Sequence, residues 1–137
     1  MKFSIIIPTK NRQLQAIEAI RSCLKSRYKN IEIIVTDGSD DNNLEFKIQD
    51  LNDPRIKYFY HKKSLAMKKN WEFGVSKATG SYVGIIGDDD ALMPDGLVFA
   101  HELLSRIEIP VIHCSAPIYA WDDYHFINRR NLINVKL

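Results

Sequence analysis

Three consecutive aspartates, Asp88, Asp89 and Asp90, have the clearest potential for chemistry in this sequence. They follow an apolar run at residues 82–86 that is typical of a buried strand. Two carboxylates about 4 Å apart repel each other by roughly 4 kcal/mol at an effective dielectric constant of about 20, so three in a row need full solvation or a cation. Carboxylate oxygens suit Mg²⁺ or Mn²⁺, with water and phosphate completing the shell. The triplet therefore predicts a divalent-metal site, and a solvated turn is the alternative.

The residues around the triplet indicate which kind of metal site it would form. In an extended backbone, Asp88 and Asp90 would point to the same side. An EF-hand loop would spread its ligands over about 12 residues and close with a glutamate. Pro94 interrupts that window, so the sequence argues against an EF-hand.

Two further polar clusters follow predicted strands. After residues 3–7 come Pro8, Thr9, Lys10, Asn11 and Arg12, and after residues 31–35 comes a polar loop that includes Asp37, Gly38 and Ser39. Ligands of open α/β sheets bind outside the carboxyl ends of the strands. If the strands are parallel, both clusters and the aspartate triplet meet at one edge. Arg12 and Lys10 would then face phosphate, and Asp37 would accept hydrogen bonds from a base or ribose. Alternatively, Lys10 and Arg12 are simply exposed, and the loop around Asp37 is a polar turn.

The elements that must position these clusters alternate between strands and helices. Strands are predicted at residues 3–7, 31–35, 56–60, 82–86, 111–114 and 118–121. Helices are predicted at 13–26, where Leu14, Ile17, Ile20 and Leu24 recur with helical spacing, and at 44–51, 66–78 and 95–106. Gly80 is expected to cap the third helix. Right-handed crossovers between such elements predict an α/β protein, a three-layer α/β/α sandwich around a mainly parallel sheet.

For several other charged, aromatic and sulfur-containing side chains, a role in ligand binding is weighed against a structural role. Lysines 62, 63, 68 and 69 form a basic cluster that would balance a diphosphate, or else a solvated helix face. Structural roles are expected for His61 and His113. Core positions are expected for Trp71 and Trp121, with an acceptor contact as the alternative for Trp121. Cys23 and Cys114 are expected to be reduced and buried.

Composition excludes several classes of protein. The 137 residues suit one domain, with 45% hydrophobic and 26% charged residues and a formal net charge of +2, which is too balanced to predict nucleic-acid binding. No apolar run is long enough for a membrane helix or a signal peptide, so a cytoplasmic location is expected, including one peripheral to a membrane. The sequence contains no Gly-x-Gly-x-x-Gly and no Gly-Lys-Ser/Thr, which argues against nicotinamide enzymes and P-loop NTPases.

Taken together, three stretches resemble the family 2 glycosyltransferases. They are residues 4–12 (SIIIPTKNR), residues 32–41 (EIIVTDGSDD) and residues 78–94, which run from ATGSYV to GDDDALMP. Their order and spacing resemble the family's opening strand with its Pro-Thr loop, its Asp-Gly-Ser loop and its Asp-x-Asp motif. The resemblance covers residues 3 to 121 approximately.

The resemblance implies a GT-A, Rossmann-like fold and a nucleotide-diphosphate sugar donor, typically linked to UDP. It implies an inverting, metal-dependent transfer to an acceptor hydroxyl, with Mn²⁺ or Mg²⁺ as cofactor. Asp89 and Asp90 would hold the metal. The donor-binding residues by the same resemblance are Pro8, Thr9, Asn11, Arg12, Asp37, Ser39, Lys69 and Asp88.

The sequence departs from the family pattern in three ways. Thr36 stands where an aspartate often precedes Asp-Gly-Ser, and Trp71-Glu72 replaces an Arg-Asn pair, for which Lys68 or Lys69 would substitute. The general base is expected beyond Leu137, so residues 1–137 read as a single domain whose C-terminal part is missing. The alternative function is a non-catalytic nucleotide-sugar-binding module. A flavodoxin-like domain with an acidic metal pocket fits less well, because that fold would need a lysine at a later strand end. The strand predicted at residues 111–114 is followed by Ser115 instead.

Overall fold

The computed structural model describes residues 1–62, 65–107 and 109 of the chain. In chain order the elements are β1 (Phe3–Thr9), α1 (Gln13–Leu24), β2 (Ile31–Asp37), α2 (Asn43–Leu51), β3 (Ile56–Tyr60), α3 (Met67–Lys77), β4 (Tyr82–Ile85) and α4 (Gly96–Leu104). The strands form one sheet in the order β3-β2-β1-β4, and every pairing is parallel. The predicted α/β architecture is confirmed for this part of the chain.

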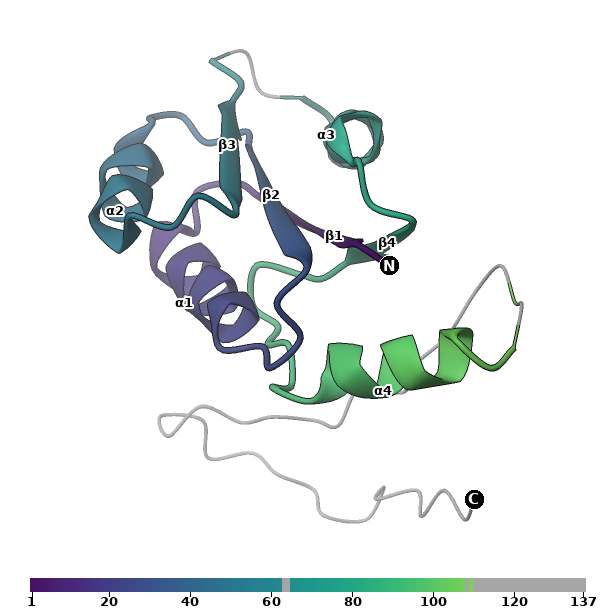
Figure 1. Ribbon diagram of the computed structural model, residues 1–137. Coiled ribbons are helices and arrows are strands. Elements are labelled where there is room, and N and C mark those ends of the chain that lie inside the picture. Colours follow the sequence, from purple (N-terminus) through teal and green to yellow (C-terminus); the bar gives the residue numbers. More distant parts are fainter. Residues whose placement is uncertain (63–64, 108, 110–137) are drawn as a thin grey trace, which may run out of the picture.

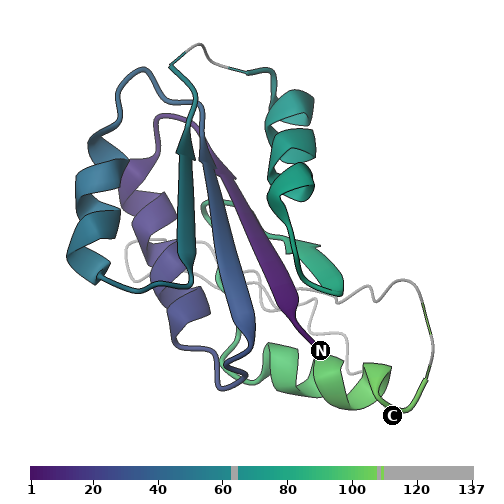
Figure 2. The same ribbon diagram turned by 45° about the horizontal axis from the view of Figure 1, so that its top comes forward.

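Helices cover both faces of the sheet, as Figures 1 and 2 show: α1 and α2 lie on one side and α3 on the other. The central strands β1 and β2 are buried almost throughout, which explains why their sequences are continuous apolar runs. The main core lies between these strands and the helices α1, α2 and α4. This three-layer arrangement agrees with the prediction.

Both central strands extend two residues further than predicted. Thr9 pairs with Asp37 in register at their ends, so residues assigned to loops belong to the sheet. Pro8 is tolerated because the backbone of Ile6, two residues earlier, faces β4, and β4 ends at Ile85. The missing N–H of Pro8 therefore points to a side where no strand needs it. The extension brings Thr9 and Asp37 to the edge of the sheet as fixed backbone positions.

Helix α1 buries Ile17 and Ile20 as predicted and packs Leu24 against the core, but it exposes Leu14. Its buried residues are Ala16, Ile17, Ala19, Ile20 and Cys23, whereas Leu14 is 69% exposed. At about 100° per residue, Leu14 lies about 200° around the helix from Ala16 and therefore faces away from the core. Cys23 is a free, buried thiol as expected, and burial raises its pKa to about 12.

Helix α3 lies close to the sheet because of a glycine. A Cβ atom at Gly74 would lie 2.5 Å from Cγ2 of Ile6 in β1, so any larger residue would push the helix away. The prediction that Trp71 is a core residue is wrong, since it is 41% exposed. Trp71 lies beside the face of α3 that carries Asn70 and Gly74 into the interior.

The role predicted for Gly80 as a helix cap is also wrong. Helix α3 ends at an extended Ala78, and no glycine of the described residues has a positive φ. Instead Gly80 N–H donates to Oγ of Ser4 at 2.8 Å, and a Cβ atom there would lie 2.7 Å from the Lys2 carbonyl oxygen. The glycine is needed for a close approach to β1. The strands predicted at 111–114 and 118–121, with His113, Cys114 and Trp121, lie outside the described residues.

Candidate functional site at the carboxyl edge of the sheet

The loops after β1 and β2 are fastened to each other at the carboxyl edge of the sheet. Gly38 N–H donates to the Thr9 carbonyl at 3.0 Å, and Asn11 N–H donates to Oγ of Ser39 at 2.7 Å. The side chain of Asn11 donates to Oδ2 of Asp40 and accepts from the Asp40 N–H, both at 3.0 Å. Asn11 has a φ of 55°, a left-handed conformation that asparagine tolerates better than most residues. This turn also directs the chain so that Arg12 faces the aspartate triplet.

The aspartate triplet is joined to the first loop through Asp88. Its Oδ2 accepts from the Thr9 hydroxyl at 2.8 Å, and its Oδ1 accepts from Nη1 of Arg12 at 2.8 Å. The same nitrogen of Arg12 donates to Oδ2 of Asp89 at 3.0 Å. The hydrogen bond and charge of Asp88, followed by those of Asp89, raise the pKa of Arg12. The expected convergence of the three polar clusters at one edge is thus present in the structure.

The triplet is a turn and does not continue the strand. Asp90 N–H bonds the Gly87 carbonyl at 3.2 Å, and Oδ2 of Asp90 accepts from the Gly87 N–H at 3.0 Å. Asp88 meanwhile faces Thr9 and Arg12. The expectation that Asp88 and Asp90 point to the same side assumed an extended backbone, and it is wrong because the chain bends immediately after β4.

Asp37 is completely buried at the end of β2. Its Oδ1 accepts from the Ser39 N–H and its Oδ2 from the Tyr58 hydroxyl, both at 2.8 Å. Burial, followed by the hydrogen bond and charge of Asp37, raises the pKa of Tyr58 well above its ordinary range. The carboxylate that was expected to meet a base therefore fixes the second loop from inside, and Ser39 links that loop to Asn11.

The predicted basic cluster does not join this edge. Nζ of Lys68 lies 3.7 Å from Oε1 of Glu72 on the outer surface of α3, and Lys69 is exposed with no ion pair to a described residue. Lys63 lies outside the described residues. His61 packs edge-to-face on Phe73, in keeping with a structural role. Of the residues predicted to bind the donor, the hydrogen bonds join Thr9, Asn11, Arg12, Ser39, Asp37 and Asp88 into two adjoining groups, and leave Lys69 apart.

The carboxylate oxygens at this edge are the kind of ligand that a divalent metal prefers, although there are few of them. The described residues contain no cluster of three metal-ligating side chains. Asp89 and Asp90 are exposed hard-oxygen donors beside the anchored Asp88. Mg²⁺ commonly takes one or two carboxylates and completes its shell with water and phosphate oxygens. A metal held by Asp89 and Asp90 would therefore complete its shell with water, and with phosphate oxygens when a substrate is bound.

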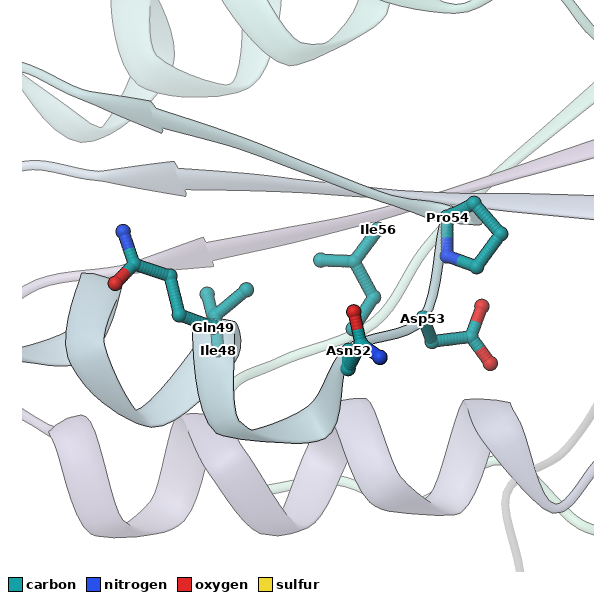
Figure 3. Close-up of a pocket in the computed structure, with 6 residues that line it drawn as sticks. All are labelled: Ile48, Gln49, Asn52, Asp53, Pro54 and Ile56. Carbon is teal, nitrogen blue, oxygen red and sulfur yellow. The ribbon is translucent and has the colours of Figure 1, made fainter.

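Two cavities of the described part lie elsewhere. One, of about 440 Å³, opens between the end of α2 and the start of β3 and is lined by Ile48, Gln49, Asn52, Asp53, Pro54 and Ile56 (Figure 3). The second, of about 300 Å³, lies between α1 and α2. Neither includes a residue of the carboxyl edge, where the Arg12 side chain spans the space between the first loop and the triplet.

Two buried groups important to the arrangement were not predicted. Asn70, in α3, donates its Nδ2 to the Thr36 carbonyl at 3.0 Å and so supports the end of β2. Glu32 accepts hydrogen bonds from Ser4, Lys2, Lys57 and Thr79 near the opposite end of the sheet. Burial alone would raise the pKa of Glu32, but the hydrogen bonds from Lys57, Ser4, Lys2 and Thr79 together lower it far below its ordinary value. The sequence signal for Glu32 is a lone charge within an apolar strand.

Comparison with known proteins gives one consistent result. The family model described as glycosyl transferase family 2 matches residues 4–134. An uncharacterized glycosyltransferase of Rickettsia conorii is 35% identical over 130 residues, which is 94% of this chain and 20% of that protein. The GalNAc(5)-diNAcBac-PP-undecaprenol beta-1,3-glucosyltransferase of Campylobacter jejuni is 35% identical over 70% of this chain and 32% of its own length. The chain thus spans a third or less of each of these two relatives.

Solved structures give the same picture of the fold. S. aureus TarS 1-349 in complex with UDP-GlcNAc matches with a TM-score of 0.70 and 24% identity over 77% of this chain and 32% of that chain. The mannosyltransferase PcManGT from Pyrobaculum calidifontis, in complex with GDP-Man and Mn²⁺, matches with a TM-score of 0.67 and 18% identity over 76% of this chain and 32% of its own. Among the described residues no helix is long and apolar enough to span a bilayer.

Proposed function

Because the chain belongs to glycosyl transferase family 2 and has the GT-A fold, we propose that its carboxyl edge binds a nucleotide-diphosphate sugar, UDP-linked, for inverting transfer to an acceptor hydroxyl. The observation that carries the proposal is the junction of Thr9, Arg12 and Asp88. It brings a cationic side chain and the acidic turn together where parallel α/β sheets bind their ligands.

Each group at the edge has a role in this proposal. Pro8, Thr9 and Arg12 border the nucleotide, and Asp88 lies near the ribose or sugar. Asp37 shapes the base-binding side through Ser39 and Tyr58, since its carboxylate is enclosed. Asp89 and Asp90 would hold Mn²⁺ or Mg²⁺, which would stabilise the negative charge of the leaving nucleoside diphosphate.

The acceptor chemistry needs residues beyond those described. Transfer to a hydroxyl requires a general base near that hydroxyl. None of the three aspartates of the triplet is free for this role in the proposal, because Asp88 is anchored and Asp89 and Asp90 would hold the metal. Two relatives have undecaprenol-linked acceptors in their names, and we infer the same class of acceptor, a lipid-linked saccharide, for this protein.

Donor binding tests the proposal directly. Calorimetry with UDP, a UDP-hexose and GDP-mannose, each with and without Mn²⁺, should show binding of the uridine nucleotides that strengthens when metal is added. Equal and weak binding of all three nucleotides, independent of metal, would contradict the proposal.

A non-catalytic binding module is the second candidate, because no general base is identified among the described residues of the carboxyl edge. Radiolabelled sugar transfer to undecaprenol-linked saccharides separates the two. Donor binding with neither transfer nor donor hydrolysis identifies the module, whereas transfer identifies the enzyme.

A further inference from the structure

The guanidinium of Arg12 lies between the carboxylates of Asp88 and Asp89, and Asp89 is one of the two carboxylates assigned to the metal. A single nitrogen, Nη1, is 2.8 Å from Oδ1 of Asp88 and 3.0 Å from Oδ2 of Asp89. Two carboxylates brought this close repel each other unless water or a cation screens them, and the Arg12 guanidinium supplies such a cation.

The two ion pairs differ in how firmly they are held. The Asp88 side chain is 9% exposed and has a second donor in the Thr9 hydroxyl. The Asp89 side chain is 56% exposed, and Arg12 is its partner among the described residues. Arg12 is itself 50% exposed and its side chain has room to turn. Exposed ion pairs contribute little stability, on the order of 0–1 kcal/mol, so the Asp89 pair opens more readily than the Asp88 pair.

We propose that Arg12 is a built-in cation that competes with the divalent metal for Asp89, so that metal binds only after the guanidinium leaves this carboxylate. The proposal rests on the proposed function, which assigns the metal to Asp89 and Asp90. Once released, the Arg12 guanidinium remains beside the edge, where it pairs with the diphosphate of the donor. Donor and metal therefore favour each other's binding through one side chain.

Metal binding to the donor-free chain tests this exchange. Mn²⁺ affinity is measured by calorimetry and by electron paramagnetic resonance for the unmutated chain, Arg12→Gln, Arg12→Lys and the matched control Arg21→Gln. Arg21 is an exposed arginine of α1, the helix that follows Arg12, and is paired with Glu18. We expect Arg12→Gln to bind Mn²⁺ about tenfold more tightly, a typical coupling between linked sites. Arg12→Lys and Arg21→Gln should stay within about twofold of the unmutated chain, since both leave a cation at position 12.

Two further measurements make the result independent of any single variant. Adding Asp89→Asn to Arg12→Gln should cancel the tighter Mn²⁺ binding. In the unmutated chain, Mg²⁺ titration should shift the side-chain N–H resonances of Arg12 toward those of a free guanidinium. Equal Mn²⁺ affinity with and without Arg12, no Mn²⁺ binding in any variant, or Mg²⁺ binding that leaves the Arg12 resonances unchanged would each overturn the exchange. UDP binding in the same samples reports on the proposed function separately.

Discussion

At the scale of single residues, the candidate site depends on a few polar side chains that the backbone places within hydrogen-bonding distance. Thr9 and Arg12 come from either side of one turn, and both donate to Asp88. A nearly buried carboxylate needs such partners, because an unpaired buried charge costs several kcal/mol, on the order of 3–5. The interaction therefore serves the fold as well as the proposed ligand.

Replacing Thr9 with valine tests this dual role. The variant keeps the shape but removes the donor to Asp88, so the free energy of unfolding should fall by about 1–3 kcal/mol. Urea unfolding at neutral pH measures the loss. Ser76→Ala is the control, since the Ser76 hydroxyl bonds a carbonyl on the exposed side of α3 and should matter by less than about 0.5 kcal/mol. Equal stability of Thr9→Val and the unmutated chain would show that the hydroxyl does not support Asp88.

The sequence predicted the location of these residues better than their geometry. The strand ends identified Thr9, Arg12 and Asp88 because polar residues after apolar runs mark the carboxyl edge of a parallel sheet. The enclosure of Asp37 was not predicted, since its partner Tyr58 lies on another strand and nothing local in the sequence links the two. The sequence indicated a turn at Asp88–Asp90 only as the alternative to a metal site, and the predicted side-chain directions were wrong because they assumed that the strand continues.

At the scale of elements, close packing of α3 against the sheet and the hydrogen bonds of Glu32 hold the strands in register. Helix α3 carries Gly74 against Ile6 and Asn70 against the end of β2. Glu32 in β2 binds groups from β1, β3 and the segment after α3. Helical periodicity predicted α3 itself, but the reason for its glycine is a tertiary contact that periodicity does not contain.

Gly74→Ala should destabilise the protein although alanine favours helices. Alanine gains about 1 kcal/mol of helix propensity over glycine. The new Cβ atom would lie 2.5 Å from Ile6 Cγ2, and relieving such overpacking typically costs about 1–3 kcal/mol. We expect a lower melting temperature for Gly74→Ala and no loss for Ser76→Ala two residues later. A Gly74→Ala variant more stable than the unmutated chain would contradict the close packing of α3.

Glu32 should make stability depend on pH in the acidic range. Its pKa is lowered in the folded state, so the unfolded state binds more protons there and stability is lost as pH falls below the ordinary value of 4.5. Urea unfolding at pH 7 and pH 3.5 should show a drop that is smaller in Glu32→Gln. Glu102→Gln, an exposed site on α4, is the control. An identical pH dependence in Glu32→Gln and the unmutated chain would rule out this contribution.

At the scale of the whole molecule, the chain provides the sheet edge to which the proposed donor would bind, and it spans only a fraction of the length of its relatives. The layer order, the parallel pairings and the family could all be predicted from the sequence, because alternating apolar strands and amphipathic helices fix the crossovers. The acceptor side could not be predicted, since no motif in the 137 residues corresponds to a general base.

Calorimetry of a UDP-sugar with and without Mn²⁺, on the unmutated chain and on Asp89→Ala/Asp90→Ala, tests the central claim most directly. The account predicts that Mn²⁺ strengthens donor binding to the unmutated chain by tenfold or more, about 1.4 kcal/mol, and has no effect on the double variant. The exposed Asp50→Ala, on α2, should behave like the unmutated chain. Donor affinity that is the same in the double variant, with metal present, would contradict the assignment of the acidic turn to the metal and diphosphate.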